Sequence, residues 1–146
     1  MNAERKDVWA AGNLYEPYVG RWSRLVAREF LKWLEVPDAQ DWIDVGCGTG
    51  ALTQAIHDYT KPKSIRAIDP SSGFIEHAKA HVHSDRARFE VGDAQALPIE
   101  TASADAAVAG LVLNFVPSPA RAVAEMVRAV RRSGVVATYV WDYAGK

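Results

Sequence analysis

The chain has little of several features that would place it in a specialised class of protein. Cys47 is its one cysteine in 146 residues, so no disulfide forms within the chain and a reducing cytosol is the expected compartment. No apolar run approaches the roughly 20 residues that a membrane helix needs, and residues 1–7 lack the hydrophobic segment of a secretory signal. These absences predict a cytoplasmic protein that is neither secreted nor inserted in a membrane.

An excess of one charge is also missing. Seventeen basic side chains stand against eighteen acidic ones, a formal net charge of −1, so nothing at the level of the whole chain favours nucleic acid or an anionic membrane as partner. With 49% hydrophobic and 24% charged residues, the composition is typical of one compact domain spanning residues 1–146. We find no internal repeats, low-complexity tracts or linkers.

Hydrophobic periodicity predicts helices alternating with strands after a first amphipathic helix at 21–34. That helix carries its apolar side chains at Trp22, Leu25, Val26, Phe30, Trp33 and Leu34. Strands are predicted at 42–45, 65–68, 87–91, 104–113 and 135–141, with helices near 52–59, 73–82 and 118–134. This alternation predicts an α/β fold, a doubly wound, Rossmann-like and mostly parallel sheet with strand order 3-2-1-4-5. Residues 40–141 would form this core, and residues 1–36 an N-terminal lid and helix.

The last predicted helix has its own start and stop signals. Ser118 is a suitable N-cap and Pro119 suits the first helical position. Gly134 is expected to end the helix. Its predicted buried side chains are Val123, Met126, Val127 and Val130.

The segment 42–50 is the most informative part of the sequence. An apolar strand runs into Asp44 and then into glycines at Gly46, Gly48 and Gly50. Glycines let the backbone turn sharply from strand to helix and let a ligand lie against the main chain, and the following helix presents free N–H groups to that ligand. The pattern is typical of a loop that binds a nucleotide-type cofactor.

Two further acids follow the next two strands. In open α/β sheets ligands bind beyond the carboxyl ends of the strands. Asp69 ends the second strand about twenty residues after the glycines, where an acid accepts both ribose hydroxyls. Asp93 follows the third strand and can accept an adenine amino hydrogen, with Ala94 and Leu97 as an apolar wall. Together these positions predict an adenosine site.

At these residues the chain resembles the class I S-adenosylmethionine-dependent methyltransferases, in particular the methyltransferase type 11 enzymes of ubiquinone and menaquinone biosynthesis. Residues 43–50, 67–71 and 91–98 are similar to the first, second and third motifs of that family, and 109–115 to its strand-four motif. The resemblance covers about residues 40–141. It implies S-adenosylmethionine as cofactor and methyl transfer to a small or medium-sized organic acceptor.

The resemblance also implies roles for single residues. Gly46, Cys47 and Gly48 would line the methionine moiety, Asp69 would hold the ribose hydroxyls, and Pro70 would pack beside the adenine.

Other roles follow from the third and fourth motifs and from the N-terminal region. Asp93 and Ala94 would recognise the adenine edge, and Leu111 would close the floor near the sulfonium. Asp44 would organise the loop and the amino group of the cofactor, directly or through water. In similar methyltransferases the region before the first helix is a lid, so Tyr18 and Arg21 are candidates to face the methionine carboxylate.

Other functions stay open at this point. Gly46, Gly48 and Ala51 also fit the dinucleotide fingerprint, so a nicotinamide-dependent oxidoreductase is the rival. A non-catalytic module that binds the cofactor is a further alternative. Methyl transfer needs mostly positioning and exclusion of water, and we name no catalytic residue.

Several tempting side chains have plainer interpretations. His77 and His81 lie one helical turn apart, with His83 close by, but no partner ligand is evident, so a solvated helix face is favoured over a metal site. No base is implied beside Cys47 that would make it a nucleophile. The late basic run fits a helix C-terminus better than a nucleic-acid site. Its members are Arg121, Arg128, Arg131 and Arg132.

By the same resemblance the family's sheet has a sixth and a seventh strand, and both are missing here. They usually supply much of the acceptor pocket, so the activity of this polypeptide is in question. The fifth strand would then be an apolar edge with unpaired N–H and C=O groups, prone to pair with another chain. We therefore expect a truncated chain, self-association, or a partner that covers this edge.

Overall fold

The computed structural model describes residues 21–140 and residue 142, and the side chain of Arg21 is not among the described parts. Five strands form one parallel sheet in the order β3-β2-β1-β4-β5. The strands are β1 (Asp41–Val45), β2 (Ser64–Asp69), β3 (Ala87–Val91), β4 (Ala104–Gly110) and β5 (Val130–Tyr139). The predicted fold class and strand order are confirmed.

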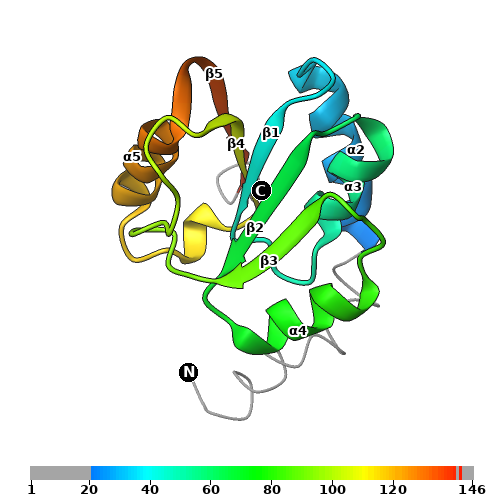
Figure 1. Ribbon diagram of the computed structural model, residues 1–146. Helices are drawn as coiled ribbons and strands as arrows, with labels where there is room; N and C mark the ends of the chain where they lie inside the picture. Colours follow the sequence, from blue (N-terminus) through cyan, green and yellow to red (C-terminus); the bar gives the residue numbers. More distant parts are fainter. Residues whose placement is uncertain (1–20, 141, 143–146) are drawn as a thin grey trace.

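Helices cover both faces of the sheet (Figure 1). Helices α2 (Arg21–Leu34), α3 (Ala51–Tyr59) and α4 (Ser72–His81) lie on one face, and α5 (Pro119–Ala129) lies on the other. A short 3-10 helix, η2 (Leu113–Phe115), follows β4. Within the described part of the chain, no helix is long and apolar enough to cross a membrane.

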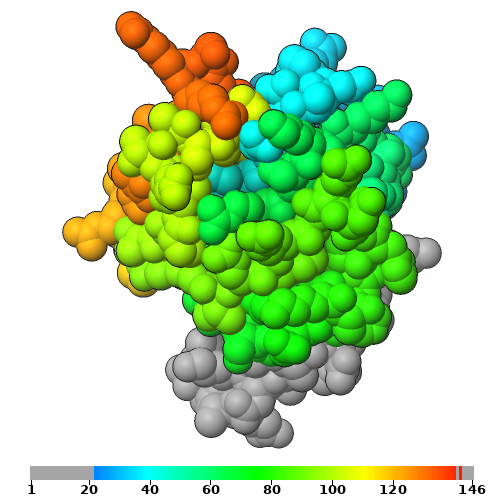
Figure 2. Space-filling model, in the orientation of Figure 1, coloured from blue at the N-terminus to red at the C-terminus, as the bar shows by residue number. Residues whose placement is uncertain are grey.

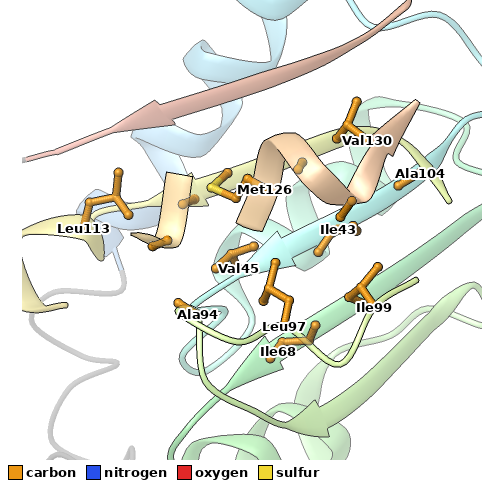
Figure 3. Close-up of a cluster of buried hydrophobic side chains, with 14 residues drawn as sticks. Ile43, Val45, Ile68, Ala94, Leu97, Ile99, Ala104, Leu113, Met126 and Val130 are labelled. Atoms are coloured by element: carbon orange, nitrogen blue, oxygen red, sulfur yellow. The ribbon is translucent and has the colours of Figure 1, made fainter. Parts of the chain in front are cut away.

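The two cores follow from the alternation of side chains along the strands. Trp42 in β1 packs with α2 and α3, whereas Ile43 and Val45 face the other side, toward α5. Figure 3 shows this second cluster, in which Met126 of α5 lies over the strands and the segment after β3 contributes Leu97. Ala94 belongs to the same cluster, so Ala94 and Leu97 both pack in the core between the sheet and α5.

Helix α2 buries a narrower face than the sequence predicted. Ala27, Phe30 and Leu31 are buried, whereas Trp22, Leu25 and Trp33 are 62%, 52% and 73% exposed. Only one stripe of the helix meets the sheet and α3, and the apolar side chains spread over a wider arc than this stripe. Their periodicity identified the helix correctly and its buried face only in part.

Helix α5 ends five residues before Gly134, the predicted stop. The N–H groups of Ala102 and Ser103 bond the last helical carbonyls, those of Arg128 and Ala129, at 2.9 and 2.8 Å. Val130 then pairs with Ala104 as the first residue of β5. The local geometry before β4 therefore ends the helix.

The start of β5 is irregular, since its register against β4 shifts between Ala104 and Ala106. In the space-filling view, orange side chains near β5 stand out at the upper left (Figure 2).

The side chains of α5 that were predicted to be buried fall into two groups. Met126 and Val130 are buried, but Val123 and Val127 are 36% and 59% exposed, because Ala122 and Ala129 take the positions against the sheet.

Strand β4 also ends earlier than predicted, at Gly110 rather than at 113. Leu111 has φ +58°, a left-handed conformation that a strand cannot continue through. The outer edge of β5 pairs with no other strand of the described residues. Pairing with a second chain there stays a prediction.

Candidate cofactor site at the carboxyl ends of the strands

The glycine loop joins β1 to α3 in a backbone conformation that needs glycine. Gly46, Gly48 and Gly50 have φ of +70°, +56° and +95°, in the region that other residues rarely adopt. A Cβ at Gly46 would collide with Val112, whereas a Cβ at Gly48 would meet nothing within 4 Å. The main chain at Gly48 therefore borders open space, as close approach of a ligand requires.

Asp69 at the end of β2 holds this loop in place. Its Oδ2 accepts a hydrogen bond from the Gly48 N–H at 3.0 Å, and its Oδ1 accepts one from the Ser71 N–H at 2.8 Å. The side chain is 6% exposed, and burial raises the pKa of its carboxyl although both hydrogen bonds oppose that rise. Each oxygen keeps a second lone pair, so Asp69 can still accept from a ligand.

Asp44 is the more isolated carboxyl. It is 1% exposed, and its Oδ2 accepts a hydrogen bond from the Thr53 hydroxyl at 2.6 Å. Its Oδ1 is buried and has no hydrogen-bond partner among the described residues. Burial raises the pKa of Asp44 to about 7; the Thr53 hydrogen bond opposes the rise and the charge of Asp69 adds to it. A buried acceptor without a partner is costly unless something else satisfies it.

A backbone hydrogen bond joins the segment after β3 to the end of β2, where Asp69 lies. The Gly92 N–H donates to the Asp69 carbonyl at 3.0 Å, which joins the tips of β2 and β3. Asp93 is exposed, and its Oδ1 accepts from the Gln95 N–H at 2.9 Å. Its second oxygen accepts no hydrogen bond from the described residues and is open to a ligand. The tips of β1, β2 and β3 thus meet, as predicted.

Helix α5 braces this segment through a pair that the sequence analysis missed. Glu125 Oε1 accepts from the Leu97 N–H at 2.8 Å, and Arg128 Nη2 donates to the Leu97 carbonyl at 3.2 Å. The Glu125–Arg128 ion pair, at 2.7 Å, lowers the pKa of the Glu125 carboxyl. The spacing of three residues on one helix face was the available signal.

The remaining residues that were predicted to contact the cofactor make fewer side-chain contacts or lie outside the described residues. Pro70 is exposed. Leu111 is half-buried, and its N–H donates to the Tyr139 carbonyl at 2.8 Å. Burial raises the pKa of the Cys47 thiol, so the thiolate that a nucleophile needs is disfavoured. Tyr18 and the side chain of Arg21 lie outside the described residues, and their predicted contact with the cofactor stays a prediction.

Two histidines of α4 contact each other, and Arg131 pairs with acids at the opposite end of the sheet. The rings of His77 and His81 stack with centroids 4.1 Å apart, and His81 Nδ1 bonds the His77 carbonyl at 2.8 Å. No three His, Cys, Asp or Glu side chains among the described residues converge on a metal-sized site. Arg131 follows α5 rather than ending it, and it pairs with Asp105 and Asp41 at the amino ends of the strands.

The sequence from 43 to 138 matches the family model described as "Methyltransferase domain". The chain belongs to this family. The match covers about two-thirds of the chain and includes the glycine loop, Asp69 and Asp93. It confirms the predicted resemblance.

Curated relatives carry related names. The malonyl-[acyl-carrier protein] O-methyltransferase of Hahella chejuensis is 36% identical over 95 residues, which are 65% of this chain and 34% of that protein. The 2-methyl-6-phytyl-1,4-hydroquinone methyltransferase of Spinacia oleracea is 34% identical over 92 residues, 63% of this chain and 27% of that protein. The chain therefore spans about a third or less of the length of these relatives.

Solved structures share the fold. A putative S-adenosyl-L-methionine-dependent methyltransferase from Methanococcus maripaludis superposes with a TM-score of 0.77 at 27% identity, covering 88% of this chain and 61% of that one. A chain from the complex between the Haloferax volcanii Trm112 methyltransferase activator and a putative methyltransferase gives 0.83 at 24% identity, with 92% and 59% covered. The second likeness concerns the fold alone.

S-adenosylmethionine is the cofactor that the family and the first of these structures imply, and the site fits it. Gly48 borders open space, Asp69 retains acceptor capacity, and Asp44 Oδ1 is a buried acceptor that lacks a partner within the described residues. A ligand that carries an ammonium and a sulfonium complements two neighbouring carboxyls that pair with no Lys or Arg among the described side chains.

Proposed function

We propose that this domain binds S-adenosylmethionine at the carboxyl ends of β1, β2 and β3 and transfers its methyl group to a small or medium-sized organic acceptor. The observation that carries the proposal is the pair of buried carboxyls, Asp44 and Asp69, beside the glycine loop. Both have raised pKa values through burial, and within the described part of the chain neither carboxyl bonds a Lys or Arg side chain. A cationic ligand would supply the missing opposite charge.

In this proposal each strand tip contacts one part of the cofactor. The main chain at Gly46, Cys47 and Gly48 lines the methionine moiety, and Asp44 acts on its amino group. Asp69 accepts the ribose hydroxyls through the lone pairs that the Gly48 and Ser71 N–H groups leave free.

The adenine would lie across the tip of β3. Asp93 and Ala94 contact its edge, and Pro70 packs beside its ring. The brace from Glu125 and Arg128 to Leu97 keeps this segment in place. Leu111, at the tip of β4, would lie near the sulfonium.

The cofactor supplies a methyl group on a sulfonium, which is already an activated leaving group. The protein's part is to hold donor and acceptor in line and to exclude water. No side chain is assigned a proton transfer. Phe115, 70% exposed just after β4, offers an apolar surface at this end of the sheet, and the acceptor would lie there.

A thermal-shift comparison tests the function. At 100 times its Kd, a ligand that binds only the native state stabilises it by about 2.7 kcal/mol, which gives a rise in Tm of several degrees for a domain of this size. We expect S-adenosylmethionine and S-adenosylhomocysteine to raise the Tm, and NAD to leave it unchanged. The reverse result would assign the glycine loop to a dinucleotide.

Activity needs a separate comparison, since the chain spans 27–34% of these relatives' lengths. Cofactor binding without methylation of malonyl-acyl-carrier-protein or hydroquinone acceptors would favour the non-catalytic binding module. The same acceptors tested with a longer form of the protein would show whether further residues complete the site.

A further inference from the structure

The buried hydrogen bond between Thr53 and Asp44 is the feature that the family match and the predicted motifs leave unexplained. Thr53 lies in the first turn of α3 and is 0% exposed. Its hydroxyl donates to Asp44 Oδ2 at 2.6 Å, and Asp44 Oδ1 has no partner among the residues described. One oxygen of this carboxyl is thus fixed, and the other is left over.

We propose that Thr53 is a positioning residue of the cofactor site, whose hydroxyl holds Asp44 with Oδ1 free and favours its ionised form for the cationic amino group of the cofactor. The inference rests on the proposed function. Thr53 acts only through Asp44 and does not itself touch the cofactor. Asp44 contacts the ligand directly or through one water molecule.

Helix α3 is a suitable support for this role. Gly50 N-caps the helix with no side-chain cap of its own, so the first turn can approach the end of β1. Leu52, Ala55 and Ile56 anchor α3 in the core. The hydroxyl is therefore held by packing rather than by the hydrogen bond alone, and its loss should leave the fold in place.

The groups around Asp44 make Thr53 the main influence that favours the carboxylate. The charge of Asp69 from β2 disfavours a second negative charge at Asp44. Both carboxylates in turn disfavour a thiolate at Cys47 in the glycine loop. On the other side, β4 presents Ala106, Ala107 and Val108 opposite residues 42–44.

Among the described side chains, helices α2, α3 and α4 on this face add no buried charge. The charged side chains of α2 that are described, all exposed, are Arg24, Arg28, Glu29 and Lys32. In α3, His57 bonds Ser84 and Asp58 accepts from Gln54 Nε2. Tyr139 of β5 packs on Phe30 of α2. Hydrogen bonds from Thr53 are the influences that lower the pKa of Asp44.

The test replaces Thr53 by Val, which keeps the shape and removes the donor, and by Ser, which keeps the donor. Thr60→Val is the matched control, because Thr60 is the C-cap of the same helix and its hydroxyl donates to the Ile56 carbonyl at 2.6 Å, not to Asp44. Calorimetry with S-adenosylhomocysteine at pH 6, 7, 8 and 8.5 gives the affinity of each protein. Thr53→Ala takes the place of Thr53→Val if the latter does not fold.

Removal of the Thr53 hydroxyl should raise the pKa of Asp44 by about one unit. This rise predicts a characteristic dependence of affinity on pH. Thr53→Val should bind about 5-fold more weakly than the wild type at pH 7 and within about twofold of it at pH 8.5, where both carboxyls are ionised. Thr53→Ser and Thr60→Val should follow the wild type throughout. Carbon-13 NMR of the Asp44 carboxyl in the ligand-free protein should show its titration midpoint moved upward in Thr53→Val alone.

Other outcomes overturn the inference in distinguishable ways. If Thr53→Val loses affinity equally at every pH, or matches the wild type at every pH, Thr53 is a packing residue and the proposed function stands. An unmoved carboxyl titration in Thr53→Val leads to the same conclusion. If the wild type itself gives no heat at any pH, the proposed function fails and the inference fails with it.

Discussion

At the amino ends of β1 and β4, Asp41 and Asp105 lie beside Arg131. Near the carboxyl end of β1, Asp44 is buried, and none of the described Lys or Arg side chains pairs with it. The hydrogen bond from the Asp41 N–H and the nearby Arg131 guanidinium hold the pKa of Asp105 below its usual range. Burial instead raises the pKa of Asp44 to about 7. Aspartate side chains thus stabilise the amino end of the sheet, where they pair with an arginine, and destabilise the carboxyl end, where Asp44 is buried. The comparison supports the proposed binding edge, because buried carboxyls with raised pKa values would be stabilised by a cationic ligand.

The largest expected effect concerns stability against pH for Asp44→Asn. The folded-state pKa, about 7, lies above the unfolded value, so the native state binds more protons and wild-type stability falls as pH rises from about 4 to 7. Asparagine does not titrate. The unfolding free energy of Asp44→Asn relative to the wild type should therefore rise by roughly 2–3 kcal/mol between pH 5 and pH 8.

Urea unfolding of both proteins at intervals of one pH unit measures this difference, and other titrating groups cancel in the comparison. A difference that stays constant from pH 5 to pH 8 would mean that Asp44 is already ionised in the native protein. The contrast between the two ends of the sheet would then be lost.

The next effect concerns binding through Asp69. Asp69→Asn removes one acceptor oxygen, and a hydrogen bond to a charged group contributes about 1.5–3 kcal/mol, so affinity for S-adenosylhomocysteine should fall about 10–100-fold. Calorimetry measures it. Glu76→Gln, an exposed change on the neighbouring α4, is the control and should bind normally. Equal affinities in both variants would remove Asp69 from the site.

The smallest effect is expected at the opposite end of the sheet. The pKa of Asp105 is lowered, so its contribution is present above the unfolded value and is lost as pH falls through the folded one. Its side chain is 25% exposed, and solvent screening limits Asp105→Asn to a loss of about 0.5–1 kcal/mol at pH 7. Denaturation at pH 7 and at pH 2.5 measures it, and the loss should vanish at the lower pH. Cofactor affinity should not change, in contrast to Asp69→Asn.

The fold and the site differ in how far the sequence predicted them. Apolar runs and helical periodicity predicted the five strands and the four α-helices that the described residues form. The glycines and acids after the first three strands predicted the binding edge, which stays a proposal. The errors lie where tertiary contacts decide. The Ala102 and Ser103 N–H groups end α5 before Gly134, and the positive φ of Leu111 ends β4.

Side-chain partners were the part of the site that sequence could not supply. Thr53 is separated from Asp44 by nine residues, and its hydrogen bond arises only because α3 folds back over β1. The brace from Glu125 and Arg128 to Leu97 spans about thirty residues. Both depend on the packing of a helix against the sheet, which no local pattern encodes.

Calorimetric titration of S-adenosylmethionine and NAD into the wild type and into an Asp44→Asn, Asp69→Asn double variant tests the central claim most directly. The account predicts one-to-one binding of S-adenosylmethionine to the wild type, affinity reduced at least tenfold in the double variant, and no heat with NAD. Absence of heat with S-adenosylmethionine, or equal affinity in the folded double variant, would contradict it.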